Sequence, residues 1–155
     1  MIEKIFEEPK YIWLLRDGRD VVSSTYSRGW YSDDDENRGK IREIWDLFRL
    51  QGNETGDISD NNWYQMSAFE KNCWYWQYVN NNIDEFLNDV PRNRKLMLRI
   101  EDFAQKSKDV QNFLSVKSFD FNILQSNKAN YKLIKWQQWD DNMKYVFKNW
   151  CGDLM

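Results

Sequence analysis

Arg16 and Ser24 carry the side chains of this sequence that we expect to bind a phosphate group. A guanidinium presents a rigid fork of N–H donors that matches phosphate oxygens, and a hydroxyl can donate one more hydrogen bond to the same anion. The two residues stand eight positions apart in YIWLLRDGRDVVSS, residues 11–24. The spacing alone leaves an alternative open, in which Arg16 forms an ion pair with Asp17 or Asp20 and Ser24 only packs.

The segment around these residues is predicted to run from a strand through a charged turn into a helix. Tyr11 to Leu15 is a short run of aromatic and branched side chains, typical of a buried strand. Gly18 falls where a tight turn is expected, and Asp20 is the candidate N-cap of the following helix. Ligands of open α/β sheets bind beyond the carboxyl ends of the strands, and this pattern puts Arg16 there.

The rest of the chain combines helical periodicity with one more strand. Helical spacing predicts helices in 41–50 and 140–155, one long helix over 63–87, and a short helix in 107–116 with Ser107 as its cap. The stretch RKLMLRIEDF, residues 94–103, contains a second buried strand. Strands separated by helices indicate an α/β fold, in which a parallel sheet is flanked by helices.

Two parallel strands alone make a poor core. We therefore interpret residues 1–155 as a single partial domain that is incomplete at its N-terminus, where a missing segment would complete the sheet.

Composition excludes several classes of function. The chain has 155 residues, a formal net charge of −3 and no histidine, and its mean hydropathy is −0.87. We expect no membrane span and no nucleic-acid partner, because there is neither a long apolar run nor a broad basic surface. Without histidine most transition-metal sites are excluded, so no metal is expected. Cys73 and Cys151 are predicted to be reduced thiols of a cytoplasmic protein.

The stretch LLRDGRDVVSS closely resembles the 3′-phosphate-binding segment of sulfotransferases that use 3′-phosphoadenosine 5′-phosphosulfate. In that family an arginine at a strand end and a serine eight residues later bind the 3′-phosphate, which implies these roles for Arg16 and Ser24. Gly18 stands where the family usually has proline. The stretches CWYWQYV (73–79), LRIEDF (98–103) and WCGDLM (150–155) resemble later family segments, in the right order.

The resemblance implies further nucleotide contacts. Tyr75 corresponds to a family tyrosine near the adenine. Lys132 and Lys135, with Lys128, lie where family members bring a basic loop over the 3′-phosphate. The alternative for these lysines is a solvated basic face.

The resemblance also implies a P-loop-like sulfotransferase fold and an enzyme that transfers a sulfuryl group. The donor would be 3′-phosphoadenosine 5′-phosphosulfate, and the acceptor a hydroxyl or amine of a small molecule, carbohydrate or protein. The family's loop for the 5′-phosphosulfate, similar to Pro-Lys-x-Gly-Thr-Thr-Trp, is not in this sequence, and neither is a histidine base. The catalytic residues are therefore unknown. We interpret the chain as the carboxyl-terminal part of a sulfotransferase, inactive when isolated.

Other interpretations remain beside this one. A sulfotransferase-derived fragment could act as a non-catalytic interaction module. A nucleotide kinase is disfavoured, because its GxxxxGK[ST] loop is missing. We expect the acidic run 33–36 to be a solvated loop rather than a metal site, and Glu101 and Asp102 to be structural rather than acid–base groups.

Overall fold

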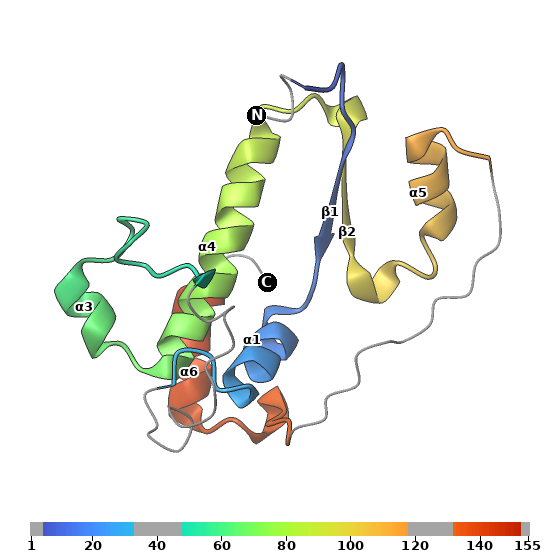
Figure 1. Ribbon diagram of the computed structural model, residues 1–155. Helices are drawn as coiled ribbons and strands as arrows, with labels where there is room; N and C mark the ends of the chain where they lie inside the picture. The colour runs from blue at the N-terminus through green and yellow to red at the C-terminus, as the bar shows by residue number, and fades with distance from the viewer. Residues whose placement is uncertain (1–4, 33–47, 118–131, 153–155) are drawn as a thin grey trace. The chain divides into compact units, whose positions relative to one another are not determined.

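The computed structural model describes residues 5–32, 48–117 and 132–152 (Figure 1). The described chain contains two β-strands, five α-helices and short 3-10 turns. In chain order these are β1 (Tyr11–Leu15), α1 (Gly18–Ser27), α3 (Asp60–Gln65), α4 (Ala68–Asn88), η3 (Arg92–Arg94), β2 (Lys95–Arg99), η4 (Ile100–Asp102), α5 (Ser107–Leu114), η5 (Trp136–Gln138) and α6 (Asp141–Cys151).

The chain divides into two compact units. The first unit comprises 1–16 with 81–128, and the second comprises 17–80 with 129–155. The sheet and α5 belong to the first unit, whereas α1, α3 and α6 belong to the second. Helix α4 contributes to both. The expectation of a single domain stays a prediction.

The two strands of the first unit pair in parallel. Tyr11 lies opposite Lys95 and Leu15 lies opposite Arg99, so both strands end at the same edge of the sheet. The predicted α/β architecture with a parallel sheet is therefore confirmed at this level.

The prediction that both strands form buried apolar runs is wrong in part. Leu14, Met97 and Ile100 are 48%, 60% and 47% exposed, although Trp13, Leu15 and Leu98 are buried. Successive side chains of a strand point to opposite faces. Helix α5 lies beside β2 (Figure 1), and Phe86 of α4 packs edge-on against Tyr11. Among the described residues these helices leave part of each face uncovered.

The single helix predicted over 63–87 is also wrong, because the chain breaks between α3 and α4. Met66 has an extended backbone with ψ 136°. The Ser67 hydroxyl accepts a hydrogen bond from the Glu70 N–H at 3.2 Å, and the Glu70 carboxylate accepts one from the Ser67 N–H at 2.8 Å. This reciprocal capping box starts a new helix and ends the previous one.

Two further expectations concern the other helices. Helix α5 forms as predicted, but Ser107 is its first residue and Lys106 occupies the cap position without a side-chain hydrogen bond. Helix α6 also forms, capped by Asp140, whose side chain accepts a hydrogen bond from the Met143 N–H. The helix predicted for 41–50 and the acidic run 33–36 lie outside the described residues, except for 48–50. None of the described helices is long and apolar enough to cross a membrane.

Aromatic rings and two thiols form the core of the second unit. Trp63 packs edge-on against Trp74, with ring centroids 5.0 Å apart. Cys73 of α4 and Cys151 of α6 are free thiols without solvent exposure, and the Cys151 Sγ donates a hydrogen bond to the Cys73 carbonyl at 3.5 Å. Burial, reinforced by a hydrogen bond with Cys151, raises the pKa of the Cys73 thiol. The core thus places both cysteines between α4 and α6, where burial favours the protonated form of Cys73.

Candidate functional site

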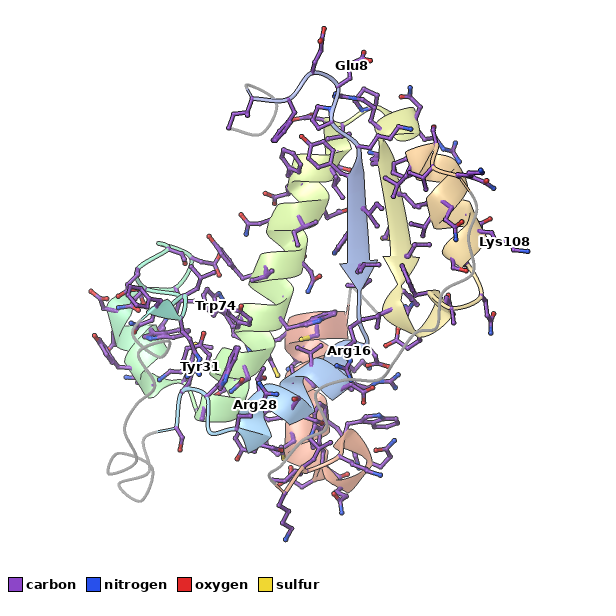
Figure 2. All side chains as sticks on the ribbon, turned by 45° about the vertical axis from the view of Figure 1, so that its right-hand side comes forward. Glu8, Arg16, Arg28, Tyr31, Trp74 and Lys108 are labelled. Atoms are coloured by element: carbon purple, nitrogen blue, oxygen red, sulfur yellow. The ribbon has the colours of Figure 1, made fainter. Side chains whose placement is uncertain are left out.

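Arg16 directly follows β1, at the carboxyl end of the sheet, and its side chain is exposed (Figure 2). It is the last residue of the first unit's amino-terminal segment. Arg99, which pairs with Leu15 in the sheet register, is also exposed at this edge. The strand end thus carries two arginines where ligands of open α/β sheets bind.

Helix α1 begins earlier than predicted, and Asp17 rather than Asp20 is its N-cap. The Asp17 carboxylate accepts a hydrogen bond from the Arg19 N–H at 2.9 Å, which satisfies a donor of the first turn. The same carboxylate accepts two hydrogen bonds from the Arg19 guanidinium, one from Nε at 3.0 Å and one from Nη2 at 2.5 Å. The pKa of Arg19 is therefore raised, mainly by its hydrogen bond to Asp17. Asp17 therefore forms an ion pair with Arg19.

Gly18 is the first residue of α1 rather than part of a tight turn. A Cβ at this position would lie 2.9 Å from the Trp76 ring of α4. Helices also accept proline at their first position, the residue that the sulfotransferase motif has here. In this chain the close approach of Trp76 requires glycine.

Ser24 lies in the middle of α1 and is half-buried. It belongs to the second unit, whereas Arg16 belongs to the first. The shared phosphate site of Arg16 and Ser24 therefore stays a prediction. The structure describes the local surroundings of each residue separately.

Contacts within the second unit bring the predicted lysine segment to α1. The Ile134 N–H donates to the Ser27 hydroxyl of α1 at 2.9 Å. The Arg19 guanidinium stacks on the Trp136 ring, 4.4 Å from its centroid. Lys132 and Lys135 are exposed on this segment. The structure thus attaches the segment of both lysines to the helix that carries Ser24.

Tyr75 lies in a separate cluster on α4. Its ring packs edge-on against Trp30, with centroids 5.5 Å apart, and Arg49 stacks on the same Trp30 ring at 4.2 Å. The Asn72 amide donates a hydrogen bond to the Trp30 carbonyl at 3.0 Å. Tyr75 is half-buried in this arrangement, and its predicted place near an adenine stays a prediction.

Glu101 and Asp102 follow β2, and their structural rather than acid–base role stays a prediction. Asp102 ends η4 and forms an ion pair with Lys106 at 3.5 Å, one helical turn along the chain. The Asp102 carbonyl accepts hydrogen bonds from the N–H groups of Gln105 and Lys106. Within the described residues no group of three acidic, cysteine or histidine side chains could hold a metal ion.

Sequence reasoning missed Arg19 and Trp136. The local signal for Arg19 is an aspartate two residues before an arginine at a helix start, which favours a cap that also forms an ion pair. The contact with Trp136 has no local signal, because 117 positions separate the two residues.

Comparison of the chain with protein-family models, curated proteins and solved structures finds no match. The resemblance to sulfotransferases therefore depends on the residues quoted from the sequence.

Proposed function

We propose that this chain binds the 3′-phosphate of a phosphoadenosine nucleotide through Arg16 and Ser24, in the manner of sulfotransferases. The observation that carries the proposal is the local order of the backbone. Exposed Arg16 directly follows the parallel strand β1 and is bonded to Asp17, the N-cap of the ten-residue helix α1 that carries Ser24. Ligands of open α/β sheets bind beyond the carboxyl ends of the strands, and helix N-termini present N–H donors to anions.

Local charge supports a role for the basic segment as well. In residues 16–20 the two arginines are balanced by Asp17 and Asp20, so the formal charge of this stretch is zero. A helix N-terminus stabilises an anion by only about 0.3–1 kcal/mol, and Asp17 already uses part of that effect. A doubly charged phosphate needs further cations. We propose that Lys132 and Lys135 supply them.

We propose sulfuryl transfer as the ancestral reaction. An acceptor hydroxyl or amine attacks sulfur in line, a base takes its proton, and cations stabilise the charge on the leaving oxygen. Loss of one oxyanion donor typically costs about 3–4 kcal/mol, so without the 5′-phosphosulfate loop we expect no detectable transfer by the 155-residue chain. Its proposed activity is nucleotide binding.

Titration calorimetry with adenosine 3′,5′-bisphosphate tests this proposal. Charge-assisted hydrogen bonds contribute about 1.5–3 kcal/mol each, so we expect a dissociation constant in the high micromolar to millimolar range. Arg16→Ala should abolish the binding. Arg92→Ala, which removes the same charge from an exposed position of η3, should leave it unchanged. A folded wild-type chain that shows no binding would contradict the proposal.

The exposed sheet favours a second candidate function, a non-catalytic interaction module. Parallel sheets are usually covered on both faces, yet Leu14 and Met97 are exposed here. A folded chain that does not bind the nucleotide would favour this second function. A radiolabelled-donor assay beside the titration tests the expected lack of transfer, and measurable turnover would refute it.

A further inference from the structure

A continuous set of contacts joins the N-terminus of α1 to Trp136. Asp17 caps the helix and holds the Arg19 guanidinium through two of that side chain's nitrogens. The flat face of the same guanidinium stacks on the Trp136 ring, with the Arg19 Cζ 4.4 Å from the ring centroid. Arg19 is therefore fixed by Asp17 in the plane of its N–H groups and by Trp136 on its face.

The residues around Lys135 are held on both sides. Its predecessor Ile134 donates its N–H to Ser27, and its successor Trp136 carries the Arg19 stack. The Lys135 backbone is itself bonded, since its N–H donates to the Gln138 side chain at 3.1 Å and its carbonyl accepts from the Gln138 N–H at 2.8 Å. The backbone of Lys135 is thus held in place, whereas its side chain is exposed to solvent.

We propose that Trp136 is a positioning residue for nucleotide binding, which holds the backbone of Lys135 against α1 so that its ammonium group can bind the phosphate at Ser24. This inference rests on the proposed function, because it needs a phosphate at Ser24. It goes beyond that function by giving a role to the Arg19–Trp136 stack, which itself touches no nucleotide.

Physical reasons favour positioning over direct contact with the ligand. The Arg19 guanidinium already bonds Asp17, so its charge is compensated and it adds little to the attraction of a second anion. Lys135 forms no ion pair with any residue that the structure describes. An anchored backbone lowers the entropy that the lysine loses on binding, and this is the effect that Trp136 provides.

A mutant cycle with adenosine 3′,5′-bisphosphate tests the proposal. We expect Trp136→Ala to weaken binding about five- to tenfold, the effect of losing one well-formed contact. Trp136→Phe keeps a ring for Arg19 and should restore most of the affinity. Because Trp136 acts through Lys135, the double variant Trp136→Ala/Lys135→Ala should bind as weakly as Lys135→Ala alone. Gln137→Ala, an exposed neighbour in η5, is the matched control and should bind like wild type.

The cycle has outcomes that overturn the proposal. Losses that add up in the double variant would mean that Trp136 acts independently of Lys135. Equal affinity of wild type and Trp136→Ala would also overturn it. Thermal unfolding of each variant shows whether it folds, and Arg19→Leu, which removes the other half of the stack, replaces Trp136→Ala if that variant does not.

A second readout needs no nucleotide. Trypsin cleaves after Lys135, and an anchored backbone resists the local opening that cleavage requires. We expect faster cleavage at this bond in Trp136→Ala than in wild type or Trp136→Phe, with cleavage after exposed Lys148 as the internal reference. Unchanged cleavage would refute the anchoring. If wild type binds no nucleotide while Trp136→Ala is cut faster, the proposed function fails and the anchor stands without its role in binding.

Discussion

The first residue of α1, Gly18, lies against the ring of Trp76, so that a Cβ built at Gly18 would come within 2.9 Å of it. Contact this close between α1 and α4 fixes the start of the helix that carries Ser24. It also gives the glycine of the RDGRD stretch a packing role in place of the turn role that the sequence predicts.

Substitution of Gly18 should therefore destabilise the chain. Alanine at a helix start is normally harmless, but here its methyl group would overlap the Trp76 ring, and overpacking typically costs about 1–3 kcal/mol. Urea unfolding of Gly18→Ala measures the loss. Gly152→Ala is the control, because its Cβ would find only the Lys148 side chain at an ordinary 3.8 Å. Equal stabilities of the two variants would argue against the steric role of Gly18.

Removal of the capping box should weaken the start of α4. Ser67→Ala removes the hydroxyl that accepts the Glu70 N–H, and loss of an N-cap typically costs about 1 kcal/mol. Ser67→Thr keeps a hydroxyl and should retain most of the stability. The free energy of unfolding in urea distinguishes the three chains. The capping account fails if alanine is as stable as serine.

The Cys73 thiol should make stability depend on pH. Its pKa is raised in the folded chain, first by burial and then by its hydrogen bond with Cys151. Because the unfolded thiol ionises near about pH 8.5, this contribution is complete below that pH and is lost as the pH rises above it. The unfolding free energy of wild type should therefore fall by about 1 kcal/mol more than that of Cys73→Ala between pH 8.5 and 9.5, and the difference in slope approaches about 1.4 kcal/mol per pH unit at higher pH. Parallel curves for the two chains would contradict this assignment.

Local patterns predicted the elements of the fold better than their ends. The parallel pairing of β1 with β2 follows from two apolar runs separated by helical periodicity, and the structure confirms it. The sequence Ser67-Ala-Phe-Glu70 contains the capping-box pattern that starts α4. The apolar spacing nevertheless predicts one helix, because it continues across the break from Trp63 to Cys73. The cap is Asp17 rather than the predicted Asp20, because Gly18, which suggests a turn in the sequence, is already the first residue of the helix.

Burial and the surroundings of the site depend on distant contacts. Met97 is exposed because the described helices leave part of the sheet uncovered, and an apolar sequence pattern alone does not predict which face is covered. The arginine and serine of the phosphate motif are recognisable because they lie eight residues apart in one stretch. The attachment of the lysine segment through Ser27 and Trp136 arises only when the chain folds back on α1.

The central claim is that Arg16 and Ser24 bind the same 3′-phosphate. It is tested most directly by the ratio of two dissociation constants, for adenosine 5′-monophosphate and for adenosine 3′,5′-bisphosphate, measured by calorimetry on one chain. Wild type should prefer the bisphosphate about tenfold or more, as one charge-assisted hydrogen bond already allows. Arg16→Ala and Ser24→Ala should each reduce this preference sharply, while Arg92→Ala retains it. A preference for the bisphosphate that survives unchanged in both variants would contradict the account.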